Sequence, residues 1–137
     1  MPWPCADANG PSAVHVAMSN TLNTPVEALE RAYPLRVTRY ERRRGSGGAG
    51  RFRGGDGVVR ELEALEPMSF SLIAERRRHS PRGAAGGEDG APGADALDGT
   101  RLAGKASGEL AAGSLLRIET PGGGGYGDAH ADPRRIL

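Results

Sequence analysis

The stretch TPGGGGYGD, residues 120–128, places five glycines within six positions, directly after a run with the alternation of a β-strand. Ordering a glycine costs more backbone entropy than ordering any other residue. Such a run is therefore either a flexible segment or a place where the backbone itself is required. Two other glycine-rich segments occur upstream, at 45–57 and 81–94. Because Phe52 and two arginines lie within the first, we interpret it as a shaped loop rather than a linker. We expect the glycines after the last strand to permit a close, side-chain-free approach to another backbone.

Between these loops the apolar residues recur mainly with a period of two, which is typical of strands. The pattern predicts strands over 13–19, 34–43, 58–65, 68–78, about 100–110 and 114–121, with a hairpin at Glu66 and Pro67 and a turn at Ala112 and Gly113. The predicted fold is therefore α+β and mostly β, with about six strands, one short helix and three glycine-rich loops. Residues 1–12 form a predicted irregular arm.

The helix is predicted after Thr24, which can act as the N-cap. Pro25 suits the first helical position, and Glu27 stands three residues after the cap, as in a capping box. Val26, Leu29 and Tyr33 fall on one helical face.

The predicted core is thin. Leu, Ile, Val and Phe make up 23 of 137 residues, about 17%, below the rough 20% line under which chains tend toward disorder. The net charge of only +1 opposes disorder, so we expect a folded chain that completes its core against another protein surface and forms part of a larger domain.

Charge and cysteine content narrow the class of protein. A nearly neutral balance disfavours a nucleic-acid binder. The single cysteine, Cys5, excludes an internal disulfide and a cysteine-based zinc site, which favours a reducing cytoplasm. No apolar run approaches the roughly 20 residues of a membrane span, and no export signal opens the chain.

Several motifs have both a chemical and a structural interpretation. A glycine run can cradle phosphate, but the helix or lysine that this needs does not follow Gly125. The RFRGGDG segment, 51–57, is more simply a turn than an RNA-binding repeat. The sequence ERRR occurs at 41–44 and 75–78, so one arginine of each trio can point inward, where it needs a carboxylate. Glu75 with Arg76 is the pair we predict, with solvated strand ends as the alternative.

Four ordered motifs together resemble the C-terminal end of the hydantoinase B/5-oxoprolinase family. They are SNTLNTPVE at 19–27, GSGGAGRFRGGDG at 45–57, SLIAERRR at 71–78 and TPGGGGYGD at 120–128. The similarity runs from about residue 13 to 128, and residues 129–137 form a tail beyond it. No single motif is decisive, but their order is specific.

The resemblance implies ATP-dependent opening of cyclic amides such as hydantoins or 5-oxoproline, or in some relatives ATP-dependent carboxylation of ketones. It implies an A-type partner subunit, ATP and a divalent metal, the last two bound mainly by the partner or by an N-terminal portion of the B-type region that this sequence lacks. Alternatives are a non-catalytic β-rich assembly module and an inactive truncated copy. Nucleic acid and membrane are not expected partners.

The candidate site residues follow from the matching motifs, as a group without individual roles. They are His15, Asn20, Asn23, Asp56, Glu75 and Arg76, with the backbone of Gly122, Gly123, Gly124 and Gly125 passing near substrate or partner. His15 has a structural histidine as its alternative. Ala17 stands where relatives have a second histidine and Ser19 where they have threonine, which puts the chemistry of this copy in doubt.

Overall fold

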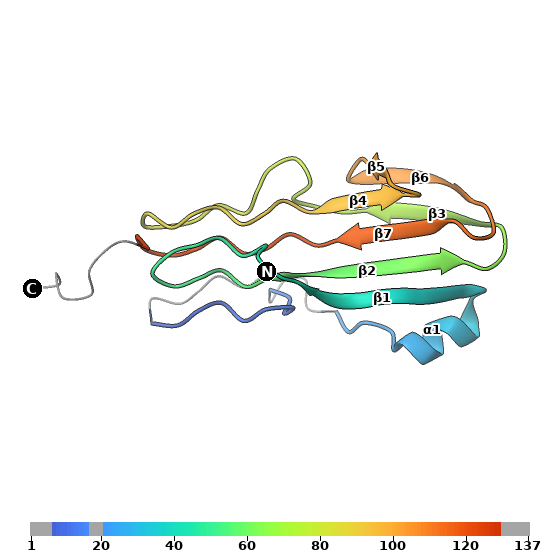
Figure 1. The fold of residues 1–137 in the computed structure, drawn as a ribbon, viewed down its shortest axis with the longest axis horizontal. Coiled ribbons are helices and arrows are strands. Elements are labelled where there is room, and N and C mark those ends of the chain that lie inside the picture. Colours follow the sequence, from blue (N-terminus) through green and yellow to red (C-terminus); the bar gives the residue numbers. More distant parts are fainter. Residues whose placement is uncertain (1–6, 17–20, 130–137) are drawn as a thin grey trace, which may run out of the picture.

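The chain folds mainly as β-structure in the computed structural model, which describes residues 7–16 and 21–129 (Figure 1). The elements are α1 (Val26–Ala32), β1 (Leu35–Arg43), β2 (Gly57–Ala64), β3 (Met68–Ile73), β4 (Ala94–Leu97), β5 (Thr100–Leu102), β6 (Lys105–Leu110) and β7 (Leu115–Glu119). Seven strands and one short helix in the described ranges confirm the predicted mostly β fold. Among these residues, no helix is long and apolar enough to cross a membrane.

The strands form two antiparallel sheets. Five strands pair in the order β1-β2-β7-β4-β5, and β3 pairs with β6 in a separate two-stranded sheet. Figure 1 shows the strands gathered at one end of the molecule, while the glycine-rich segments continue them toward the other end. Helix α1 lies beside β1, where the Glu30 carboxylate accepts a hydrogen bond from the Val37 backbone N–H at 2.8 Å.

The two faces of the five-stranded sheet differ in polarity. Register partners share a face, so Leu62, Leu116 and Leu97 lie together on an apolar inner face. The two-stranded sheet lies on this side, because Arg77, which follows β3, pairs with Asp95 of β4. The opposite, outer face is mainly charged, although the buried Val59 also lies on it. Its charged residues are Arg36, Arg39, Glu41, Arg43, Glu61, Glu63, Arg117 and Glu119.

The core is as thin as the composition predicts. In the described part of the chain, the buried hydrophobic side chains are Val59, Ala64, Leu110 and Leu116. Strand β3 shows the predicted alternation, since Met68, Phe70 and Leu72 are half-buried and the intervening residues are exposed.

The predicted hairpin at Glu66 and Pro67 is wrong. Strand β2 pairs with β1 and β7, whereas β3 crosses into the other sheet and pairs with β6. The strand predicted over 68–78 also ends at Ile73 rather than Arg78, because Arg76 has a φ of 58° that no strand accommodates. Strand β4 has no counterpart among the predicted strands, since Ala94–Leu97 follows a glycine-rich segment and has little apolar bulk.

Two predictions near the N-terminus are also wrong. The predicted strand at 13–19 does not form over 13–16, where Ala13 has a φ of 59° within a turn, and 17–19 lies outside the described residues. The helix begins one residue later than predicted, with Pro25 rather than Thr24 as the N-cap and no side-chain capping bond. Pro25 has an extended ψ of 143° and lies outside the helix, so the helix starts after it and no capping box forms.

Candidate functional site

A bundle of extended glycine-rich segments, residues 46–56, 81–91 and 121–126, occupies the end of the molecule opposite the strands (Figure 1). The run 122–125 hydrogen-bonds to both other segments. Gly123 N–H donates to the Gly55 carbonyl and Gly125 N–H to the Glu88 carbonyl, each at 2.8 Å. The run therefore lies between the other two segments and ties them together. We call residues 46–56, 81–91 and 121–126 the glycine bundle.

Side chains have no room between these backbones. A Cβ atom built on Gly122 would lie 1.8 Å from the Ser46 carbonyl oxygen, and one on Gly124 would lie 2.0 Å from that of Arg82. A Cβ on Gly54 would lie 2.1 Å from the Gly123 oxygen. Distances below 3.0 Å do not occur for real Cβ atoms, so glycine is required at these positions. The run after β7 makes the backbone approach that its composition suggested.

The same hydrogen bonds argue against phosphate binding by residues 122–125. A phosphate cradle needs several free backbone N–H groups directed at one point. Here the N–H groups of Gly122, Gly123 and Gly125 donate to the carbonyls of Ala91, Gly55 and Glu88. The glycines are therefore used for packing backbone on backbone.

Asp56 anchors the start of the glycine bundle. Its side chain is 7% exposed, and Oδ1 accepts hydrogen bonds from the Gly47 N–H at 3.0 Å and from Arg53 Nη2 at 3.2 Å. Arg42 Nε lies 3.5 Å from Oδ2. The backbone of Asp56 also bonds to Ser12 and Ala13, so it ties the N-terminal segment to the bundle.

Replacing Asp56 by alanine is expected to lower the free energy of unfolding by about 2 kcal/mol, since the Gly47 N–H and two guanidinium groups lose their shared acceptor. Amide hydrogen exchange at Gly47 should accelerate, and urea unfolding should shift to lower concentration. Asp56→Asn is the matched control: it keeps an oxygen acceptor and removes the charge. Equal exchange rates at Gly47 in Asp56→Ala and the native chain would contradict this role.

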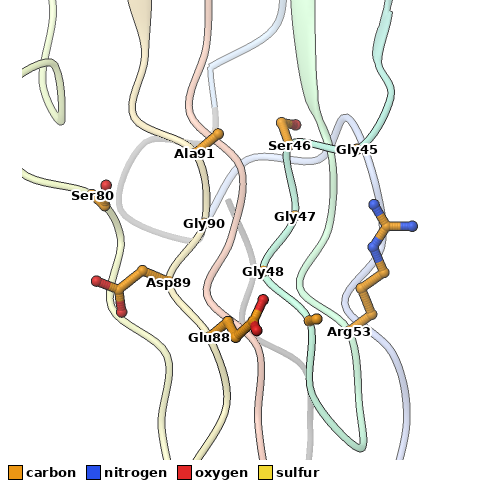
Figure 2. Close-up of a pocket in the computed structure, with 11 residues that line it drawn as sticks. Gly45, Ser46, Gly47, Gly48, Arg53, Ser80, Glu88, Asp89, Gly90 and Ala91 are labelled. Atoms are coloured by element: carbon orange, nitrogen blue, oxygen red, sulfur yellow. The ribbon is translucent and has the colours of Figure 1, made fainter. Parts of the chain in front are cut away.

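A shallow hollow opens on the glycine bundle (Figure 2). Glu88 and Asp89 come from the 81–91 segment, and Arg53 lies on the opposite side of the hollow. Asp89 Oδ1 accepts a hydrogen bond from the Gly83 N–H at 2.8 Å, so that carboxylate serves the bundle's own backbone. The remaining lining is mostly glycine and small residues, which offer backbone rather than reactive groups.

The structure does not gather the predicted site residues in one place. Asn23 donates to the Tyr40 hydroxyl of β1 at 3.1 Å, Asp56 lies in the glycine bundle, and His15 is exposed. Glu75 and Arg76 are exposed and line a second hollow, distinct from the one in Figure 2. Asn20 lies outside the described residues, as do Ala17 and Ser19.

In the second ERRR trio one arginine points inward, as predicted, but the predicted partner is wrong. Arg77, rather than Arg76, makes the buried pair: Nε lies 2.8 Å from Asp95 Oδ2 and Nη2 lies 2.9 Å from Oδ1. In the first trio Arg43 lies on the outer face, half-buried, and its Nε lies 2.9 Å from Glu119 Oε2. Sequence reasoning missed Asp95 and Glu119 because both lie far along the chain from their partners.

Metal ligands do not cluster in 7–16 and 21–129. Within these ranges no group of three or more His, Cys, Asp or Glu side chains could hold a metal ion. The described residues therefore do not by themselves fit the divalent metal that the resemblance implies.

The chain is similar in sequence to parts of longer proteins. The chain is 47% identical over 124 residues to 5-oxoprolinase 1 of Arabidopsis thaliana, covering 87% of this chain and 10% of that protein. It is 36% identical over 137 residues to a Pseudomonas sp. protein named as the B-type part of a D-/L-hydantoinase, covering 94% of this chain and 23% of the relative.

A solved structure has the same fold over most of the chain. The ATP-dependent caprolactamase of Pseudomonas jessenii matches with a TM-score of 0.65 and 29% identity, over 78% of this chain and 20% of that one. The chain thus spans about a tenth to a quarter of the relatives it matches. The family model described as hydantoinase B/oxoprolinase matches residues 4–129, and the chain belongs to this family.

Proposed function

We propose that this chain forms the C-terminal part of the B-type region of an ATP-dependent cyclic-amide hydrolase, acting with an A-type subunit on a hydantoin or 5-oxoproline ring. The observation that carries the proposal is the family match over residues 4–129, which include the glycine bundle and both sheets, together with 47% identity to a 5-oxoprolinase over 87% of the chain. At that identity the backbone contacts that require glycine are expected to be shared.

The exposed area supports a role within a larger assembly. Large apolar side chains are exposed on the described part of the chain. Apolar side chains at the surface include Leu22, Tyr33 and Ile73, with 99%, 60% and 79% exposed. The rest of the enzyme would cover part of this area, consistent with a domain completed by its neighbours.

ATP and the divalent metal are proposed to bind mainly outside these residues. In the described part of the chain, the N–H groups of Gly122, Gly123 and Gly125 donate within the fold, and no cluster of metal ligands forms. ATP is expected to activate the ring carbonyl before water attacks, because an unstrained lactam is a stable amide. The role proposed for this chain is to contribute residues that line and complete the active site of the whole enzyme.

A chimera tests the proposal. Residues 7–128 would replace the matching segment of 5-oxoprolinase 1 from Arabidopsis thaliana, and ring opening of 5-oxoproline would be measured with and without ATP. We expect ATP-dependent turnover within about tenfold of the parent, a change of about 1.4 kcal/mol in activation free energy, since ATP and the metal are proposed to bind mainly outside this segment. A chimera carrying Gly124→Val serves as the control and should be inactive.

The chimera also separates the alternatives. A chimera that folds but lacks turnover would support the assembly module and contradict a catalytic contribution. Product formation that requires bicarbonate and a ketone would indicate the carboxylase relative instead.

A further inference from the structure

A basic hollow lies at the end of the two-stranded sheet, away from the hollow of Figure 2. The loop after β3 and the turn before β6 line it, and its side chains include Glu75, Arg76, Arg78, His79 and Lys105. Three of these five are cationic at neutral pH, and Glu75 is the carboxylate among them. We call this set the basic hollow.

The loop that carries the basic hollow is held from both sides. Ala74 N–H donates to the Gly104 carbonyl at 2.7 Å, and Gly93 N–H donates to the Arg76 carbonyl at 2.9 Å. These bonds fix the loop to the β5–β6 turn and to the segment before β4. The outer arginines therefore project from a backbone that is already ordered.

The middle arginine is neutralised within the fold. Arg77 donates two hydrogen bonds to the Asp95 carboxylate and a third from Nη1 to the Glu75 carbonyl at 2.7 Å. The charge of Arg77 is therefore paired within the fold. Glu75 serves Arg77 only through its backbone, so the Glu75 side chain can be changed without loss of this bond.

The other cations of the basic hollow have no carboxylate partner in the described part of the chain. Within residues 7–16 and 21–129, no carboxylate pairs with Arg76, Arg78 or Lys105, although seven ion pairs form elsewhere. Arg76 also adopts a φ of 58°, a left-handed conformation that arginine rarely takes. Such strained positions concentrate at ligand sites.

We propose that the basic hollow binds the phosphate group of a small ligand. Guanidinium groups match phosphate oxygens through paired hydrogen bonds, and lysine adds a point charge. The basic hollow has three cations and one carboxylate, so its net positive charge favours a dianionic ligand over a ligand with a single carboxylate. The proposal is independent of the cyclic-amide hydrolase function, because it rests on side chains of the 74–79 loop and Lys105 alone.

The test is a titration of the 137-residue chain with inorganic phosphate, pyrophosphate, ATP and adenosine at low ionic strength, followed by amide chemical shifts. We expect saturable shifts at 74–79 and 103–105 with the three phosphate compounds and none with adenosine. Tighter binding of ATP than of pyrophosphate would identify a nucleotide as the source of the phosphate, and equal affinities would identify inorganic phosphates.

Matched variants make the result decisive. Arg78→Gln with Lys105→Gln should weaken phosphate binding at least about tenfold, because each removes a charge-assisted contact. Arg101→Gln removes an exposed arginine outside the hollow and should leave the affinity unchanged. Glu75→Gln should tighten binding, a gain that misfolding does not produce. Shifts with adenosine alone, an affinity that the double substitution leaves intact, or no saturable shifts in the folded chain would each overturn the proposal.

Discussion

Replacing Gly124 by alanine is expected to cost at least about 3 kcal/mol of unfolding free energy, and to leave most of the chain unfolded if its total stability is near the low end of about 5–15 kcal/mol. The added Cβ would lie 2.0 Å from the Arg82 carbonyl oxygen and 2.4 Å from its carbon. Backbone rather than a flexible side chain blocks it, so at least one segment of the glycine bundle must move. Urea unfolding followed by circular dichroism measures the effect.

Gly108→Ala is the matched control for this prediction. Gly108 is exposed in β6, and its added Cβ would meet the edge of the Phe70 ring at 3.3 Å, a side chain that can shift. We expect a change of less than about 1 kcal/mol there, because alanine also loses less backbone entropy on folding. Similar costs for the two substitutions would show that glycine-bundle packing does not limit stability.

Replacing Arg77 by methionine is expected to cost about 3–5 kcal/mol, because it leaves the Asp95 carboxylate buried without its cation. Asp95 has a side-chain exposure of 0%, and Arg77 supplies both hydrogen bonds to its oxygens. The pair also joins the two sheets, so its loss should loosen β3 and β6 first. Amide hydrogen exchange in Met68–Ile73 and the urea midpoint both report the change.

Two further variants separate the ion pair from the surrounding packing. Arg77→Met combined with Asp95→Leu should recover most of the lost stability, since both buried charges are then absent. Arg39→Met removes the exposed partner of Glu41, 2.7 Å away, and should cost less than about 1 kcal/mol. A double substitution no more stable than Arg77→Met alone would mean that shape, not charge, dominates at this position.

The ion-paired arginines of the two ERRR motifs show where sequence reasoning reaches its limit. The two ERRR motifs indicate one buried guanidinium each, because alternate strand residues face opposite ways. The partners, Glu119 and Asp95, lie 76 and 18 residues further along the chain and meet their arginines only through the sheet order and its loops. The pairing predicted within the motif, Glu75 with Arg76, fails because Arg76 turns into a left-handed conformation.

The candidate site illustrates the same limit. Asn23, Asp56 and Glu75 form one predicted group because they lie in matching motifs, yet they bond to β1, the glycine bundle and Arg77 respectively. Whether they act in catalysis stays a prediction. The ERRR motif at 75–78 indicates only part of the basic hollow, because Lys105 reaches the 74–79 loop only when β6 pairs with β3.

The local elements follow from the amino-acid order alone: period-two runs for β1, β2, β3 and β7, a short helix, and glycine segments that need a close backbone approach. The family resemblance rests on the same local motifs. The three-dimensional fold is needed to know which strands pair, that β2 and β3 form no hairpin, and that three distant glycine segments pack together. Alternation of apolar residues and turn residues determine structure over a few neighbouring positions, whereas strand pairing depends on contacts between distant segments. Glycine has no side chain, so its presence does not indicate which segment it will contact.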